Sequence, residues 1–179
     1  MSNSDNKLMK LVTARATKGQ PVLELGCSHG GLVSRLIKNG YNALGIEGRP
    51  KYGRGAHCLN GDIRELDKIL GSRKFEAIYA RGVFNQPAQI AYLFAERDLS
   101  VTYAMAINPN AKKEIGDYIP EQIKLMLEQT YKHLTDGGCA ILLENVTILD
   151  RLGFERTTAE EIGYRIIQFE PPLAILQHP

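Results

Sequence analysis

Short apolar runs and amphipathic segments alternate along most of the chain. Apolar runs bounded by turn residues predict buried strands, and apolar positions that recur three and four residues apart predict helices. The predicted buried strands are Val22–Leu25, Tyr41–Glu47, Ala56–Asn60, Phe75–Ala80 and Cys139–Val146. Two alternating segments on either side of a Pro-Pro pair, Tyr164–Phe169 and Leu173–Leu176, predict a terminal pair of antiparallel strands.

Helical periodicity fills the intervals between the predicted strands. Apolar residues at helical spacing predict a helix that begins at Leu32, directly after the first strand. Asp62 is the predicted N-cap of another helix, with Glu65 placed to close a capping box. Further helices are predicted to begin at Pro87 and Pro120, and a short lead-in helix is predicted within residues 1–20. The alternation predicts an α/β fold with helices on both faces of a mostly parallel sheet of about seven strands.

Two connections depart from this strand–helix rhythm. Only eight residues, Gly48–Gly55, separate the second strand from the third, whereas a crossover between parallel strands takes about a dozen or more. This crossover is therefore predicted to be a single turn. Residues 100–119 fit no simple helix, because apolar residues alternate with smaller ones until Asn108-Pro109-Asn110 breaks the pattern. We expect an extended segment there.

Composition restricts the class of protein. The 179 residues suffice for one domain, 1–179, and 44% hydrophobic with 23% charged residues is ordinary for a globular protein. A net charge of +2 argues against a dedicated nucleic-acid binder and against binding to anionic membranes. No apolar run approaches the ~20 residues that span a bilayer, and no signal segment opens the chain. Three cysteines without framework spacing fit a reducing compartment, so a cytoplasmic protein without a metal site is predicted.

Residues with chemical potential gather where the predicted strands end. The segment Glu24–Gly30 closes the first strand, Glu47 ends the second, Asp62 follows the third, Arg81 follows the fourth and Glu144 ends the fifth. The carboxyl ends of parallel strands meet at one edge of a sheet, where ligands bind near the topological switch point. We therefore expect one site at this edge.

The glycine-rich turn after the first strand predicts a ligand other than a dinucleotide. In the dinucleotide fingerprint, pyrophosphate rests on a helix N-terminus, whereas here Glu24 precedes the glycines and would repel it. A carboxylate at this place instead attracts an ammonium group. Glu47 can accept hydrogen bonds from both hydroxyls of a ribose. Asp62 can accept from an exocyclic amine while Ile63 packs against an adenine face, and together these features outline S-adenosylmethionine.

The run Val22-Leu23-Glu24-Leu25-Gly26-Cys27-Ser28-His29-Gly30 resembles the signature of class I S-adenosylmethionine-dependent methyltransferases. Other segments resemble that family's motifs in the same order: Gly45-Ile46-Glu47, Asn60-Gly61-Asp62-Ile63, Phe75–Gly82, His133–Gly138 and Gly153-Phe154-Glu155. The resemblance extends from about Pro21 to the C-terminus. It implies a Rossmann-like methyltransferase sandwich and an enzyme that uses S-adenosyl-L-methionine and releases S-adenosyl-L-homocysteine.

The resemblance also implies roles for individual residues. The implied cofactor-binding set is Glu24, Gly26, Cys27, Ser28, Gly30, Glu47, Gly48, Asp62, Ile63, Ala80 and Arg81. Its turn residues would lie against the methionine part, and Ala80 and Arg81 would border the reacting methyl group. Ser28 stands where a glycine is common, which ordinary backbone dihedrals would allow. The candidate catalytic residues are Arg81, as a contact for a substrate carboxylate, and Glu144, as a base or an orienting group.

The sequence restricts the methyl acceptor less than the cofactor. The segment Arg81–Pro87 lacks the Asn/Asp-Pro-Pro-aromatic run expected of enzymes that methylate exocyclic amines, which favours a small metabolite. The alternatives are a protein, peptide or RNA acceptor, and a cofactor-binding module without turnover that serves a catalytic subunit. Residues 100–119 are predicted to form a partial lid, a homodimer contact or a cover over one sheet edge.

Overall fold

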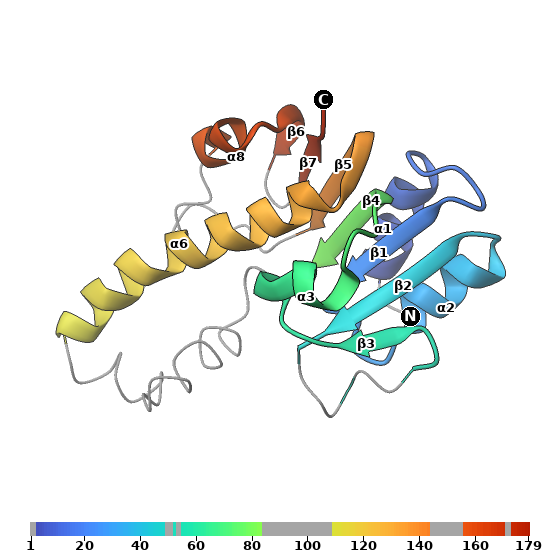
Figure 1. Cartoon of the computed structure of the whole chain (residues 1–179), viewed down its shortest axis with the longest axis horizontal. Coiled ribbons are helices and arrows are strands. Elements are labelled where there is room, and N and C mark those ends of the chain that lie inside the picture. Colours follow the sequence, from blue (N-terminus) through green and yellow to red (C-terminus); the bar gives the residue numbers. More distant parts are fainter. Residues whose placement is uncertain (1–2, 49–51, 53–54, 84–108, 144–155, 171–172) are drawn as a thin grey trace.

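The structure is a computed structural model of the chain, and it describes residues 3–48, 52, 55–83, 109–143, 156–170 and 173–179. A seven-stranded sheet with the order β3-β2-β1-β4-β5-β7-β6 forms its centre (Figure 1). The strands are β1 (Pro21–Leu25), β2 (Asn42–Glu47), β3 (Cys58–Asn60), β4 (Phe75–Arg81), β5 (Leu134–Leu143), β6 (Arg165–Glu170) and β7 (Leu173–Gln177). The first five are parallel, and β7 runs antiparallel to both β5 and β6. The predicted α/β fold and its terminal antiparallel pair are confirmed.

Helices cover both faces of the sheet (Figure 1). One face carries α1 (Asn3–Thr13) and α2 (Gly31–Lys38). The other carries the 3-10 turn η1 (Ile63–Glu65), α3 (Leu66–Leu70), α6 (Pro109–Lys132) and α8 (Arg156–Ile162). The sheet is therefore the middle layer of three, and its central strands are shielded from water on both sides.

Alternate residues of the central strands pack into two separate cores. In β4, Ala77 and Tyr79 belong to the core under α1 and α2, whereas Ile78 and Ala80 belong to the opposite core. All four side chains are fully buried. Because successive side chains point to opposite faces of a strand, a strand covered on both faces requires a continuous apolar run. This requirement explains why β4 has no charged residue between Ala77 and Ala80.

The long helix α6 corrects the prediction for residues 100–119. The helix begins at Pro109, so residues 109–119 are helical rather than extended, and Pro120 lies inside the helix instead of opening it. Proline suits the first turn of a helix, and the segment that follows, Asn110–Glu114, contains good helix formers but no apolar stripe. Periodicity therefore missed a helical start that local propensity supports. The rest of that segment, and the helix predicted at Pro87, lie outside the described residues.

Two smaller boundaries also differ from prediction. The strand β5 begins at Leu134 rather than Cys139, with a register shift against β4 between Phe75 and Ala77. Asp62 is the N-cap that was predicted, but its partner in the capping box is wrong, because the Glu65 carboxylate accepts from Lys68 Nζ at 2.6 Å. The described residues of the β2–β3 crossover, namely 48, 52 and 55–57, contain no helix. Within the described ranges, no helix has the length and apolarity to cross a membrane.

Candidate functional site

The turn between β1 and α2 has a backbone conformation that demands glycine. Gly26 and Gly30 have φ values of +72° and +70°, in the left-handed region. A Cβ atom on Gly26 would overlap Cγ2 of Val83, and one on Gly30 would lie 2.6 Å from Sγ of Cys58. Ser28 also has a positive φ, 52°, so the expectation of ordinary dihedrals at this position is wrong. A left-handed non-glycine residue costs roughly 1–2 kcal/mol, and such strain is concentrated at functional sites.

Hydrogen bonds from the end of β2 stabilise this turn. The backbone N–H of Ser28 donates to Glu47 Oε2 at 2.8 Å, and the Glu47 side chain is only 3% exposed. The N–H groups of Gly26 and Cys27 both donate to the carbonyl oxygen of Ile46, at 2.8 and 3.1 Å. The predicted ribose acid therefore lies directly beside the predicted methionine turn.

Glu24 is a buried acid on the face of the sheet that α1 and α2 cover. Its side chain is 7% exposed and lies beside Tyr79 of β4, whose hydroxyl donates to Glu24 Oε2 at 3.5 Å. Burial raises the pKa of Glu24 to about 8, against the opposing charge of Arg81, and the charge of Asp5 raises it further. At neutral pH most of this carboxyl is protonated, and a cation placed beside it would favour ionisation.

Arg81 lies at the end of β4, at the predicted edge of the sheet. Its guanidinium forms an ion pair with Asp5 of α1, and its side chain remains 43% exposed. Ala80, directly before it, is fully buried. The pair brings the N-terminal helix to the site, next to Glu24. The other candidate catalytic residue, Glu144, lies outside the described residues.

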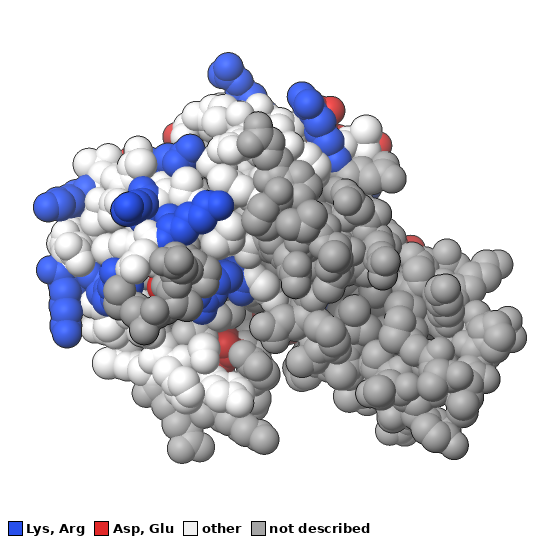
Figure 2. Space-filling view, turned by 180° about the vertical axis from the view of Figure 1, so that it is seen from behind, with Lys and Arg blue, Asp and Glu red and all other residues white. Residues whose placement is uncertain are grey.

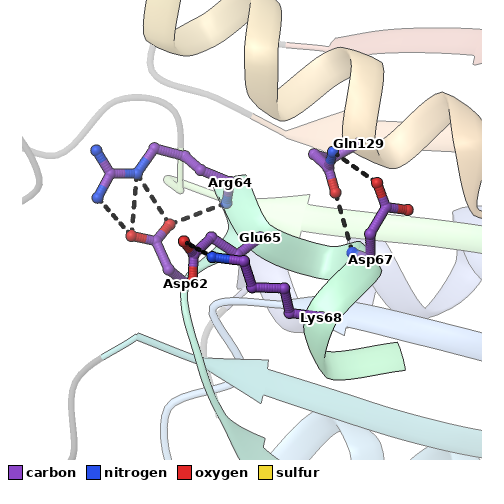
Figure 3. A network of polar contacts seen from close by, with 6 residues as sticks. All are labelled: Asp62, Arg64, Glu65, Asp67, Lys68 and Gln129. Carbon is purple, nitrogen blue, oxygen red and sulfur yellow. Dashed lines mark hydrogen bonds and ion pairs between the residues drawn. The ribbon is translucent and has the colours of Figure 1, made fainter. Parts of the chain in front are cut away.

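Asp62 follows β3 and contacts Arg64 (Figure 3). Its half-burial by itself would raise the pKa of the carboxyl, but the hydrogen bonds and charge of Arg64 outweigh burial and hold this pKa below its ordinary value. Ile63, the predicted adenine neighbour, is buried. Gly48 lies close by, since a Cβ on it would be 3.7 Å from the carbonyl oxygen of Gly61.

Sequence reasoning missed three side chains at this edge. Asp5 lies in the polar lead-in, and nothing in the linear pattern connects it to Arg81, 76 positions away. Tyr79 reads as a core residue, although strand register places it beside Glu24. Arg64 carried a usable signal, because the Asp-x-Arg spacing at a helix start allows the two side chains to meet.

The two thiols near the turn are packing groups. Burial, and then the hydrogen bond with Cys58, raises the pKa of Cys27 far above that of a reactive cysteine. His29 packs edge-on against Tyr52, with ring centroids 5.1 Å apart. Among the described residues, no group of three or more His, Cys, Asp and Glu side chains could hold a metal ion.

No protein-family model and no curated protein sequence matches this chain. Solved structures do match it. A TehB-like SAM-dependent methyltransferase from Corynebacterium glutamicum gives a TM-score of 0.64 at 16% identity, covering 96% of this chain and 86% of that one. N-methyltransferase NodS from Bradyrhizobium japonicum, solved in complex with S-adenosyl-L-homocysteine, gives 0.57 at 14% identity, covering 98% and 86%. A ribosomal protein L11 methylase from Lactobacillus delbrueckii subsp. bulgaricus gives 0.57 at 15% identity, covering 98% and 78%.

The chain therefore has the Rossmann-like fold of class I S-adenosylmethionine-dependent methyltransferases, as its motifs implied. At these identities the likeness concerns the fold. What the site does must be argued from its own residues.

Proposed function

We propose that this protein is an S-adenosylmethionine-dependent methyltransferase that acts on a small metabolite. The observation that carries the proposal is the placement of Glu24, Glu47 and Asp62 on or directly after the neighbouring strands β1, β2 and β3. The glycine turn lies between the first two. The NodS structure, which has this fold, contains S-adenosyl-L-homocysteine, and this supports the same cofactor here.

The described residues fit such a cofactor. Gly26 and Gly30 give the turn the left-handed backbone that it requires, and Val83 and Cys58 pack where their Cβ atoms would lie. Glu24 is a buried acid whose ionisation an ammonium group would favour. Glu47 accepts a hydrogen bond from Ser28 of the turn and is the proposed contact for the ribose diol, and Arg64 keeps Asp62 ionised as the proposed acceptor for an exocyclic amine.

Most of the work of this chain would be to position the reactants. The bound cofactor supplies a methyl group on a sulfonium, which is already a good electrophile. The protein then aligns the acceptor and excludes water, and such alignment can lower a barrier by as much as ~7–11 kcal/mol. Arg81 is the proposed contact for an acceptor carboxylate, because its half-exposed guanidinium already binds the Asp5 carboxylate.

A second candidate acceptor is an anionic macromolecule such as RNA. Residues 1–48 contain six Lys and Arg against three Asp and Glu. Two of those acids, Glu24 and Glu47, are buried, and the third is paired with Arg81. Figure 2 shows lysines and arginines gathered over the side of the molecule where α1 and α2 lie, and the exposed lysines of this part are Lys7, Lys10, Lys18 and Lys38. A basic surface beside the site favours a polyanionic acceptor.

Titration calorimetry with S-adenosyl-L-methionine and S-adenosyl-L-homocysteine tests the cofactor. We expect both to bind, and Glu47→Gln to weaken binding at least tenfold, because a charge-assisted hydrogen bond contributes roughly 1.5–3 kcal/mol. Glu160→Gln on α8, whose carboxylate pairs with Arg156 at an exposed position, is the matched control and should bind as the wild type does. The absence of binding at millimolar ligand would refute the proposal.

Transfer of labelled methyl groups identifies the acceptor class. The protein is incubated with labelled cofactor and, separately, with a metabolite extract and with macromolecules from the same cells. Label in the metabolite fraction supports the proposal. Label that RNase releases supports the second candidate, and label that protease releases indicates a protein or peptide acceptor. Cofactor binding with no label in either fraction would support a module without turnover.

A further inference from the structure

The carboxylate of Asp62 is held by one residue two positions further along the chain. Within the described part of the chain, all the hydrogen bonds that this carboxylate accepts come from Arg64 (Figure 3). The backbone N–H of Arg64 donates to Oδ1 at 2.9 Å, and Nε donates to Oδ1 and Oδ2 at 3.0 Å each. Nη2 forms an ion pair with Oδ2. Both side chains are largely shielded, Arg64 being 13% and Asp62 22% exposed.

The helix start does not require this arginine side chain. An N-cap acid stabilises a helix through backbone N–H groups, and the backbone N–H of Arg64 already provides that contact. The guanidinium adds a second restraint. Its Nη1 donates to Gln122 Oε1 on α6 at 3.1 Å, so the group is fixed between the end of β3 and the long helix. The orientation of the Asp62 carboxylate is therefore set by two elements of the fold.

This arrangement leaves little freedom in what Asp62 can bind. A carboxylate offers about four acceptor positions, and three N–H groups of Arg64 make four contacts with this one, because the Nε N–H is shared between Oδ1 and Oδ2. A further donor can therefore be accepted only at the position that Nε shares, so the carboxylate takes at most about one. Because the neighbouring guanidinium keeps the carboxyl ionised, it has no proton to donate, and a ligand atom that is itself an acceptor would meet unfavourable charge.

We propose that Arg64 is a positioning residue that orients Asp62 toward the exocyclic amine of the purine and so makes the site selective for 6-amino over 6-oxo purines. This inference rests on the function proposed above. A 6-amino purine presents one N–H group to the remaining acceptor position. A 6-oxo purine presents a carbonyl oxygen, leaving two acceptors face to face, and sites built around a ligand donor reject analogues that lack it.

The experiment measures two dissociation constants for each variant by titration calorimetry, one for S-adenosyl-L-homocysteine and one for S-inosyl-L-homocysteine. The variants are Arg64→Ala, Arg64→Lys, Gln122→Ala and Asp62→Asn. Lys68→Ala is the control, because Lys68 is in the same stretch and forms an ion pair with Glu65 at an exposed position. Thermal melting of each protein shows whether it remains folded.

We expect the wild type to prefer the adenosyl ligand by at least tenfold. In Arg64→Ala this preference should fall several-fold, mainly through weaker adenosyl binding. Arg64→Lys should restore only part of it, because an ammonium cannot reproduce the planar set of donors that a guanidinium presents. Asp62→Asn should lose most of the preference, since its amide can donate to the 6-oxo group. Lys68→Ala should match the wild type.

The ratio of the two constants separates positioning from a purely structural role. A lost structural ion pair lowers the melting temperature and weakens both ligands alike, so an unchanged ratio in Arg64→Ala would overturn the inference. Tighter adenosyl binding in Arg64→Ala would also overturn it, by showing that Arg64 competes for Asp62. If Arg64→Ala does not fold, Arg64→Lys and Gln122→Ala provide the same readout. Failure of the wild type to bind S-adenosyl-L-homocysteine refutes the proposed function itself.

Discussion

Two acids at the same edge of the sheet are held in opposite states of charge. Glu24 lies on the face under α1, and burial raises its pKa to about 8. Asp62 lies on the side of η1 and α6, and Arg64 keeps its pKa below the ordinary value. Each carboxyl has an arginine nearby. The difference is that Arg64 donates several hydrogen bonds to Asp62, whereas Arg81 is paired with Asp5 and Glu24 is buried.

The comparison shows that a nearby arginine keeps a shielded carboxyl ionised here only where it donates hydrogen bonds to that carboxyl. Desolvation disfavours the ionised form at both places. Multiple hydrogen bonds from Arg64 reverse this effect at Asp62, whereas Glu24 receives the charge of Arg81 without a hydrogen bond from it, and Asp5 partly cancels that charge. A protonated Glu24 would ionise when a cationic group of a ligand binds beside it.

The substitution Glu24→Gln should produce the largest change in stability. With a folded-state pKa of about 8 against 4.5 for the free group, wild-type stability should fall as pH rises from about 5 to about 8 and then level off. The limiting slope is about 1.4 kcal/mol per pH unit. The glutamine variant lacks this slope, so its free energy of unfolding should exceed that of the wild type by several kcal/mol at pH 8. Urea denaturation at unit steps from pH 5 to pH 9 measures it.

The opposite acid provides the control for that series. The pKa of Asp62 is lowered in the folded protein, so its contribution is present above the ordinary pKa and disappears as the solution becomes acidic. Asp62→Asn should therefore leave the slope between pH 5 and pH 8 unchanged. Parallel slopes for wild type and Glu24→Gln across this range would show that Glu24 is already ionised in the folded protein.

A smaller effect is expected from Asp5→Asn, which removes the charge that helps to keep Glu24 protonated. The charge of Asp5 raises the pKa of Glu24, and its loss also frees Arg81 to act on that carboxyl. The pH at which stability levels off should therefore move downward, while the size of the total loss shrinks. The same denaturation series detects the change. A shift toward higher pH would mean that the Asp5–Arg81 pair does not govern Glu24.

The sequence predicted the sheet and the positions of the three acids, but not their partners. Strand ends follow from apolar runs and turn residues, so Glu24, Glu47 and Asp62 were all placed at one edge. Burial of Glu24 depends on α1 packing on the face of the sheet where Glu24 lies, which brings Asp5 next to Arg81 across 76 positions. The local pattern of apolar and polar residues does not predict a contact between residues so far apart in the sequence. The left-handed conformation of Ser28 could not be predicted either, because its hydrogen bond to Glu47 joins the turn to the end of β2, 19 positions away.

The smallest effect is expected for Lys68→Ala. This variant tests whether the Asp62–Arg64 pair contributes more to stability than an exposed pair because it is shielded from solvent. Lys68 and Glu65 are in the same short stretch and 2.6 Å apart, yet their side chains are 74% and 52% exposed. An exposed ion pair contributes at most about 1 kcal/mol, and the value falls with salt because water and ions screen both charges. We therefore expect a loss of about 0.5 kcal/mol or less in urea denaturation at low salt, and none at 1 M salt.

Arg64→Ala in the same assay should lower the free energy of unfolding more and show weaker salt dependence, because its partner is largely shielded. Equal losses and equal salt dependence for the two variants would mean that the Arg64 contact behaves as an ordinary surface pair, and the contrast between the two acids would then rest on the burial of Glu24 alone.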